Sequence, residues 1–278
     1  MSGSGWPERR GWRAYLFVPP RLFAKATDPD LRRGGPLILD LEDAVAPGAK
    51  ERARDAVHRL LGSGCRAYVR INGSATPWFE DDLRILNSEA LLGTLLPKAE
   101  DPDAVAHVAA SLGGRASVIP LIETAAGLER VEPIAGGPRV ERLAFGALDF
   151  RLDLGLGPGW LELLYARARI ATASRAAGLL RPLDSAEPDL SAGARFALVA
   201  RRARRLGFGA KLCVHPSQVP VANRCLAPGP EAVAWARRVL EQPGTEPRRI
   251  DGSMVDAPVV EEARRTLEEG EWTPSPDS

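Results

Sequence analysis

Short apolar runs alternate with longer amphipathic stretches along most of this chain. In each run, apolar residues occupy consecutive positions, so both faces of the run are apolar. Strands of a parallel sheet that is covered by helices have this pattern. The candidate strands span residues 13–18, 36–42, 66–72, 93–98, 116–123, 142–149, 179–184 and 210–215. Eight strand–helix units in one uninterrupted alternation predict an α/β fold, a (β/α)8 TIM barrel.

Helical patterns lie between these runs and also follow the last one. The candidate helices of the barrel include 49–61, 78–89, 102–112, 159–177 and 191–206. A Pro/Gly break at 227–230 precedes a helix over 231–241, an apolar run over 250–255 and a final helix over 259–268. This last part is too small to fold alone. We therefore predict a catalytic barrel over 13–226 and a helical C-terminal extension over 227–278.

Composition and charge exclude several classes of protein. The net charge is +1 and both signs are spread along the chain, whereas a nucleic-acid partner would require a basic face. No apolar run approaches the roughly 20 residues of a membrane span. The opening MSGSGWPERRGW lacks the apolar core of a signal peptide. The three cysteines are far apart, which favours neither a disulfide framework nor a cysteine metal site. We expect a cytoplasmic enzyme with no membrane or nucleic-acid partner.

Charged side chains finish several of the predicted strands. The second strand ends in Asp40, Glu42 and Asp43, and the third in Arg70. Glu123 ends the fifth and Asp149 the sixth. The carboxyl ends of barrel strands meet at one rim, so these groups should lie together there. Oxygen ligands suit Mg²⁺, with Mn²⁺ as the alternative, and only His215 lies near the rim to favour zinc.

Each of these residues also has a purely structural interpretation. Glu123 could stabilise the start of the following helix, and Asp149 could cap a turn. Arg70 could pair with Asp40 or Glu42 within the barrel wall. Period-two alternation places Asp40 and Glu42 on one face and Asp43 on the other. Structural and catalytic roles are both open for these three acids, and we expect structural roles for Lys98 and His215.

At the same positions the sequence resembles the citrate lyase β-subunit-like branch of the HpcH/HpaI aldolase family. The resemblance rests on the motifs LDLEDAV, VRIN, LIETAAG, GALD and HPSQ, which occur in family order. It implies a TIM barrel that binds Mg²⁺ through Glu123 and Asp149, with Glu123 also facing the substrate. It also implies that Arg70 holds a keto-acid carboxylate. The activity implied is cleavage or formation of a 3-hydroxyacyl thioester of the malyl-CoA, citramalyl-CoA or citryl type.

The acid–base group of such a reaction is open. Candidates are Asp40, Glu42 and above all Asp43 in the second strand, and Asp256 in the extension. In some relatives an aspartate of the extension reaches a neighbouring subunit, so a homotrimer or hexamer is the expected assembly. The partners would be a keto acid and an acyl-CoA or acyl-carrier thioester.

Two other functions remain as alternatives. The loop after the first strand contains Pro19, Pro20 and Arg21 and is shorter than the family's usual Pro-Gly-x-x-Arg-Pro. This difference favours an aldolase that acts on free hydroxy-keto acids without a thioester. The third possibility is a non-catalytic binding paralogue, against which the presence of Arg70, Glu123 and Asp149 argues.

Overall fold

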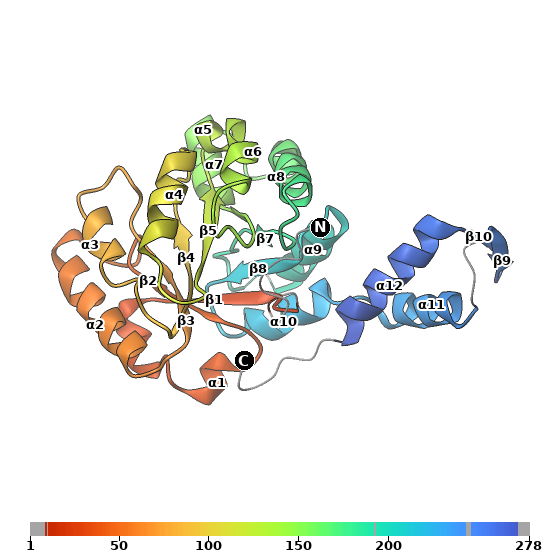
Figure 1. The fold of residues 1–278 in the computed structure, drawn as a ribbon, viewed down its shortest axis with the longest axis horizontal. Helices are drawn as coiled ribbons and strands as arrows, with labels where there is room; N and C mark the ends of the chain where they lie inside the picture. The colour runs from red at the N-terminus through yellow and green to blue at the C-terminus, as the bar shows by residue number, and fades with distance from the viewer. Residues whose placement is uncertain (1–8, 10, 192, 243–245, 272–278) are drawn as a thin grey trace.

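Eight parallel strands close into one barrel, in which every strand pairs with its neighbours in chain order (Figure 1). This computed structural model describes residues 9, 11–191, 193–242 and 246–271. The strands are β1 (Ala14–Val18), β2 (Leu37–Asp40), β3 (Ala67–Arg70), β4 (Leu91–Leu96), β5 (Ser117–Ile122), β6 (Ala144–Phe145), β7 (Leu183–Asp184) and β8 (Ala210–Cys213). The prediction of a TIM barrel is confirmed.

Helices surround this barrel and continue into the extension. They are α1 (Pro29–Arg32), α2 (Lys50–Gly62), α3 (Phe79–Leu83), α4 (Pro102–Ser111), α5 (Ala125–Glu129), α6 (Val131–Ala135), α7 (Ala147–Leu154), α8 (Leu164–Ala176), α9 (Gly193–Arg205), α10 (Gln218–Leu226), α11 (Pro230–Glu241) and α12 (Ala257–Glu271). Short 3₁₀ turns are η2 (Pro20–Lys25), η3 (Pro47–Ala49) and η4 (Leu161–Leu163). No helix of the described residues is long and apolar enough to cross a membrane.

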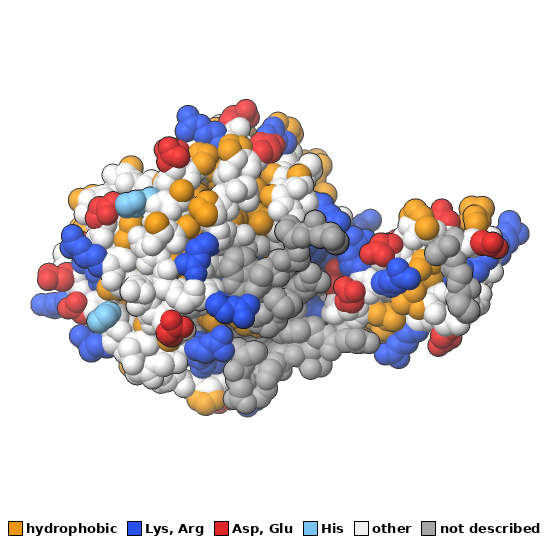
Figure 2. Space-filling view, viewed as in Figure 1, with side chains coloured by type: hydrophobic (Ala, Val, Ile, Leu, Met, Phe, Trp, Pro, Cys, Tyr) orange, Lys and Arg blue, Asp and Glu red, His pale blue; other side chains and the backbone are white. Residues whose placement is uncertain are grey.

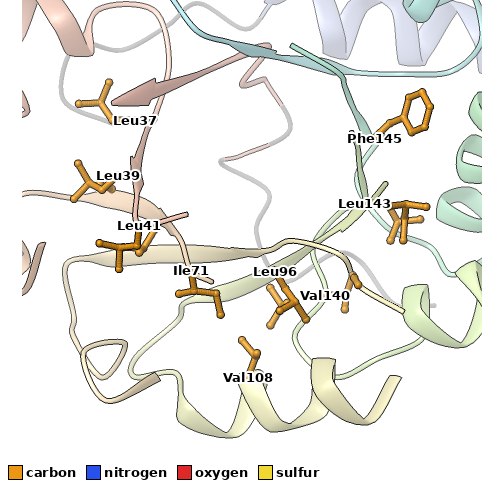
Figure 3. Close-up of a cluster of buried hydrophobic side chains, with 14 of the residues drawn as sticks. Leu37, Leu39, Leu41, Ile71, Leu96, Val108, Val140, Leu143 and Phe145 are labelled. Atoms are coloured by element: carbon orange, nitrogen blue, oxygen red, sulfur yellow. The ribbon is translucent and has the colours of Figure 1, made fainter. Parts of the chain in front are cut away.

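Alternate residues of each strand face two different layers of core. In β2, Ile38 joins Tyr15 and Tyr68 in the cluster inside the barrel. Leu37 and Leu39 point the other way, into the cluster between the barrel and its helices (Figure 3). This arrangement explains why the strand sequences are apolar on both faces.

Several predicted elements are shorter than expected or divided. The sixth strand stops at Phe145, and helix α7 then packs Phe150 against Phe145 at 5.5 Å between ring centroids. Asp149 therefore lies in the first turn of α7 and does not end a strand. The seventh strand begins late, because Pro182 has no N–H to donate to the neighbouring strand.

The helix predicted over 78–89 ends early, and the run over 250–255 folds back on itself. Helix α3 stops at Leu83, shortly before the turn-forming pair Asn87 and Ser88. The second segment forms an antiparallel hairpin of β9 (Arg248–Ile250) and β10 (Ser253–Val255). Asp251 and Gly252 make the turn, both with positive φ, as the tight turns of two-residue hairpins require.

The amino-terminal end of the barrel is closed by side chains. Arg9 donates to Ser117 Oγ at 2.8 Å and pairs with Glu141, which also accepts a hydrogen bond from the Tyr68 hydroxyl. All of these groups lie before or at the beginning of a strand. The open mouth is consequently at the carboxyl ends of the strands.

Helices α11 and α12 project from the barrel with the β9–β10 hairpin at their outer end (Figure 1). They enclose a small apolar cluster of their own, which consists of Ala236, Val239, Ile250, Val255, Val260 and Ala263. The end of α12 returns to the barrel, where Glu269 pairs with Arg181 at 2.8 Å and Arg204 at 3.6 Å. These two arginines precede β7 and β8. The extension therefore contacts the end of the barrel opposite the mouth. The division at residue 226 stays a prediction.

The surface and the free thiols agree with the sequence patterns. On the face shown in Figure 2, basic and acidic side chains are interspersed over the barrel and the extension. Cys213 is a buried free thiol. His58 and His107 lie exposed on helices. Most of residues 1–12, on which the prediction of no signal peptide rests, lie outside the described part of the chain.

Candidate active site

The second and third strands end in an aspartate and an arginine that face each other. Asp40 and Arg70 are register partners in neighbouring strands. Arg70 Nε donates to Asp40 Oδ1 at 2.8 Å and Arg70 Nη2 to Oδ2 at 2.7 Å. This parallel pair of hydrogen bonds holds the guanidinium in one plane. Burial alone would lower the pKa of Arg70, but the hydrogen bonds and charge of Asp40 raise it, so this group stays a cation.

Two further acids surround the same guanidinium. Arg70 Nη1 lies 2.8 Å from Glu42 Oε2 and 3.1 Å from Asp43 Oδ2. Glu42 is buried, which raises the pKa of its carboxyl, whereas the Asp43 side chain is 63% exposed. Arg70 thus forms salt bridges with both Asp40 and Glu42, the two acids with which a structural role would pair it. Since Asp43 is exposed, it is the acid best able to leave Arg70 for another carboxylate.

Glu123 follows β5 and is almost fully buried at the mouth. Its Oε1 accepts the backbone N–H of Lys98 at 2.8 Å and lies 3.7 Å from the Lys98 ammonium. Lys98 Nζ also lies 3.2 Å from Glu42 Oε1, so this lysine connects the two carboxylates. Lys98 forms salt bridges as expected, but they lie inside the site.

The pKa of Glu123 is raised to about 8. Burial is the largest cause, and the negative charges of Glu42 and Asp149 add to it, while Lys98 opposes them. The negative charges of Glu42 and Asp149 thus both act on Glu123. A buried carboxylate whose ionisation is opposed by neighbouring negative charges is stabilised in its ionised form by a cation.

Gly146 makes room for the Glu123 carboxylate. A Cβ at this position would lie 2.4 Å from Glu123 Oε2 and 2.7 Å from Glu123 Cβ. The same glycine precedes α7, whose first turn carries Asp149. The GALD motif therefore combines two functions, because its glycine admits one carboxylate and its aspartate supplies the next.

These groups open into one cavity of about 350 Å³ at the mouth of the barrel. Its polar lining consists of Arg21, Asp40, Asp43, Arg70, Glu123, Asp149 and Ser185. Phe17, Leu121, Leu148, Leu212 and Val214 are among its apolar lining residues. The volume suits a small organic acid.

The donor set fits a hard divalent cation bound by few protein ligands. Acids outnumber bases around the mouth, and Glu123 and Asp149 both border the cavity. Among the described residues, no three His, Cys, Asp or Glu side chains form a complete metal cage. Mg²⁺ is typically held by one or two carboxylates, and water and substrate complete its octahedron. The pair Glu123 and Asp149 matches that mode and does not match a structural zinc site.

The structure does not bring Asp256 to this mouth. Asp256 lies between β10 and α12, at the outer end of the extension, where its Oδ1 accepts the Val259 N–H at 3.3 Å. His215 is also turned outward and contacts Ser217 Oγ through Nδ1 at 2.8 Å. Lys50 donates to the carbonyls of Leu41 and Glu42 and to Asn72, and makes no salt bridge with the acids of the mouth.

Sequence reasoning missed two polar groups of the cavity. Ser185 follows β7 directly, so its place after a predicted strand was the signal that could have found it. Arg21 lies in the turn η2 after β1. Its position could have been found from the same rule, because that loop also follows a barrel strand.

Comparison with known proteins decides the family. Residues 13–216 match the HpcH/HpaI aldolase/citrate lyase family. The chain belongs to this family. A citrate lyase subunit beta-like protein of Deinococcus radiodurans is 36% identical over 280 residues, which cover 92% of this chain and 96% of that protein.

Other members of the HpcH/HpaI family carry more specific names. The mitochondrial citramalyl-CoA lyase of Homo sapiens is 30% identical and covers 92% of this chain and 84% of its own length. The solved CitE protein of Mycobacterium tuberculosis, in complex with magnesium, acetoacetate and coenzyme A, superposes with a TM-score of 0.79 at 32% identity. The superposition covers 94% of this chain and 99% of that one. The prediction that this chain is a carbon–carbon lyase is confirmed by the lyase names of these relatives.

Proposed function

We propose that this protein is a Mg²⁺-dependent lyase that cleaves or forms a 3-hydroxyacyl thioester of the malyl-CoA, citramalyl-CoA or citryl type. The products of cleavage would be a keto acid and an acyl thioester. The observation that carries the proposal is the meeting of Arg70, Glu123 and Asp149 in one cavity. The names of the lyase relatives, and the magnesium and coenzyme A bound to the related CitE, support the same chemistry.

Glu123 and Asp149 would hold the metal, and Mn²⁺ could replace Mg²⁺ because both prefer oxygen ligands. When bound there, Mg²⁺ would lower the pKa of the substrate hydroxyl during cleavage and would polarise the keto carbonyl during condensation. The protein's part is to place both carboxylates at the cavity. Lys98 opposes the rise in the pKa of Glu123, since its charge and its backbone N–H both favour the ionised carboxylate.

Arg70 would bind the carboxylate next to the reacting carbon. Asp40 occupies two of its N–H groups and fixes the plane of the guanidinium, so the remaining edge points in one direction. Glu42 and Asp43 both lie at that edge, 2.8 Å and 3.1 Å from Nη1, and Asp43 is the exposed one of the two. An incoming carboxylate would displace Asp43 and leave it free beside the reacting carbon. Orientation of this kind lowers the entropic part of the barrier.

Cleavage needs a group that accepts the hydroxyl proton and one that protonates the thioester enolate. As the hydroxyl loses its proton, the carbon–carbon bond breaks and its electron pair passes to the carbon beside the thioester. Asp43 is the candidate from the same chain, because it is exposed and borders the cavity. Asp256 could act only on the site of another copy, because it lies at the outer end of the extension.

A second function follows from the loop after β1. Residues Pro20–Lys25 form a 3₁₀ turn that brings Arg21 to the cavity in place of a longer loop. If this loop does not receive a thioester arm, the same site could cleave a free hydroxy-keto acid as an aldolase. Both functions use Arg70, Glu123 and Asp149. They differ in whether the substrate is attached to a thioester carrier or is a free acid.

A product screen tests the proposal. Glyoxylate, pyruvate and oxaloacetate are each incubated with acetyl-CoA or propionyl-CoA and Mg²⁺, and thioester masses are followed. We expect a new 3-hydroxyacyl thioester that disappears with EDTA and returns with Mg²⁺ or Mn²⁺. No thioester product, together with cleavage of a free hydroxy acid, would establish the aldolase instead. Binding of both substrates without turnover would indicate a non-catalytic paralogue.

A matched pair of variants locates the metal. Asp149→Asn removes the charge of the proposed ligand, and Asp153→Asn makes the same change one turn later in α7, where Asp153 accepts the Ala125 N–H. Asp149→Asn should lose most turnover and Mg²⁺ binding while keeping its fold, and Asp153→Asn should keep both. Full activity of Asp149→Asn in metal-free buffer would contradict the assignment.

A further inference from the structure

A second cavity, of about 390 Å³, lies beside the mouth of the barrel. The two cavities share Leu148, Ser185, Ala186 and Pro188 as a common wall. In β7 and β8, Leu183 and Leu212 face the inside of the barrel. Lys211 alternates with Leu212 and lines the second cavity instead. This cavity therefore lies outside the barrel wall, between β7 and β8 and the helices α7, α8 and α9.

The lining of this cavity is strongly basic. Its cationic side chains are Arg151, Arg167, Arg195, Arg202 and Lys211. Glu187 is the one acid among the described residues that line it. Such a lining is the reverse of the acidic mouth next to it, and it favours an anion.

Acids near the cavity neutralise only part of this charge. Buried Asp184 accepts a hydrogen bond from Arg167 Nε at 2.9 Å and another from Lys211 Nζ at 2.9 Å. Glu187 lies 3.5 Å from Arg195. Only two carboxylates thus pair with the five cations, and among the described residues neither Arg151 nor Arg202 forms a salt bridge.

Two buried guanidinium nitrogens of the lining have no hydrogen-bond acceptor among the described residues. They are Arg167 Nη1 and Arg151 Nε. Arg167 is 3% exposed and is held between two rings, 4.1 Å from the Trp160 centroid and 5.1 Å from that of Phe145. It cannot turn to solvent without breaking its bond to Asp184. A buried charged donor without an acceptor is costly, so an oxyanion in the cavity would be stabilising.

We propose that this cavity binds a phosphoryl group. A tetrahedral, multiply charged oxyanion can accept from several guanidinium groups at once, which a single carboxylate cannot do as fully. TIM barrels often bind phosphate with the loops after strands seven and eight, and the loop after β7, residues 185–188, lines this cavity. The group could belong to a free phosphate ester or to the carrier of a thioester, and the chemistry is the same. This proposal does not depend on the lyase reaction.

Fluorescence of the intact protein tests the proposal directly. Trp160 lines the cavity, so its emission should change as inorganic phosphate is added at constant ionic strength. The change should saturate at millimolar phosphate, be absent with chloride, and be lost in Trp160→Phe. A thermal shift with the same titration should give the same Kd.

Three arginine variants assign the signal to the cavity. Arg167 is not replaced, because its loss would leave Asp184 with one partner and could unfold the protein. Arg151→Gln and Arg202→Gln should each weaken phosphate binding by about tenfold, the usual value of a lost charge-assisted contact. Arg201→Gln, on the same helix but outside the lining, should bind as the wild type does. Unchanged phosphate binding in Arg151→Gln and Arg202→Gln, or no binding by the wild type, would overturn the proposal.

Two further ligands identify the source of the phosphoryl group. Coenzyme A carries phosphoryl groups and pantetheine carries none. If coenzyme A displaces phosphate and pantetheine does not, the cavity holds the phosphoryl end of a carrier. If neither displaces phosphate, it holds a free phosphate or phosphate ester. Both results support a phosphoryl site, whereas displacement by pantetheine to the same extent would contradict it.

Discussion

At the scale of single residues, Arg70 must satisfy two requirements. Its double hydrogen bond to Asp40 ties β3 to β2, and its remaining edge borders the cavity. A guanidinium has five N–H groups in a fixed fork, so it can serve a structural partner and a substrate together. A lysine at this position offers one point charge and cannot do both.

Replacing Arg70 by lysine should therefore affect catalysis more than folding. We expect Arg70→Lys to lower kcat/KM by about a hundredfold or more, with the keto-acid KM raised. The control is Arg54→Lys, because Arg54 Nε also donates to a buried carboxylate, Asp82, at 2.9 Å but lies outside the cavity. Melting temperatures and kinetics of both variants are compared. If Arg70→Lys were destabilised but kinetically normal, Arg70 would be a structural residue.

At the scale of elements, the turn from β6 into α7 positions two carboxylates. Gly146 leaves space for Glu123, and the helix that follows presents Asp149. A side chain at Gly146 would push Glu123 aside without exposing the core. The position of this turn, and not only the identity of the acids, thus determines the proposed metal site.

Gly146→Ala should impair metal binding while the barrel stays folded. The added Cβ would come within 2.4 Å of Glu123 Oε2, so the carboxylate must shift. We expect the Kd for Mg²⁺, measured by calorimetry, to rise by at least about tenfold, because one of two ligands is displaced. Gly48→Ala is the control, because a Cβ there meets nothing within 4 Å. Equal Mg²⁺ affinity in both variants would contradict this role of the glycine.

The buried Asp184 connects β7, β8 and α8 and gives a second prediction at this scale. Burial alone would raise the pKa of Asp184, but the charges and hydrogen bonds of Lys211 and Arg167 outweigh it and lower the pKa. An acid with a depressed folded pKa stabilises the protein fully above its unfolded pKa of about 3.9. This stabilisation is lost as the pH falls below that value toward the folded pKa.

Unfolding free energies from urea titrations test this pH dependence. At pH 7, Asp184→Asn should be less stable than the wild type by about 3–5 kcal/mol, because two buried cations lose their partner. The difference should shrink as the pH falls below about 4, because the unfolded wild-type chain then binds a proton at Asp184 that the folded carboxylate does not yet bind. Asp251→Asn, which breaks the exposed pair with Arg238, should cost under about 1 kcal/mol. A difference for Asp184→Asn that is constant with pH would contradict the assignment.

At the scale of the whole molecule, the extension projects from the barrel (Figure 1), and it contacts the barrel at the end opposite the mouth. Near the carboxyl end of α12, Glu269 pairs with Arg181 at the amino-terminal end of the barrel. Asp256 directly precedes the other end of this helix. If Asp256 takes part in catalysis, it must therefore act on another copy in a homotrimer or hexamer.

Mixing two inactive variants tests this arrangement. Asp256→Ala and Asp149→Ala should each be nearly inactive alone. After the subunits are dissociated and reassembled together, part of the activity should return, because some sites combine an intact Asp149 with a partner's intact Asp256. Asp251→Ala, in the same hairpin region, should stay active alone. No recovery in mixed oligomers of proven composition would exclude Asp256 from a shared site.

Local pattern alone was sufficient to predict the barrel and the residues of its rim. Strands that are apolar on both faces must be buried between two layers. Asp40 and Arg70 end such strands, and Glu123 follows one directly. Whether a residue ends or follows a strand can be inferred from its neighbours in sequence. The places of these three residues at the rim could therefore be predicted without coordinates. Asp149 was predicted at the right rim but in the wrong element, because the preference of Phe150 for Phe145 is a contact that the strand pattern does not contain.

Tertiary structure decided the relations between distant residues. Only the closed sheet showed that Arg70 already holds Asp40, that Gly146 accommodates Glu123, and that Lys98 connects Glu42 with Glu123. The basic cavity also has no local signature, since Arg151, Arg167 and Arg202 come from three helices and resemble ordinary surface arginines in the sequence. Such features depend on distances across the fold and on burial, which a pattern of neighbouring residues does not specify.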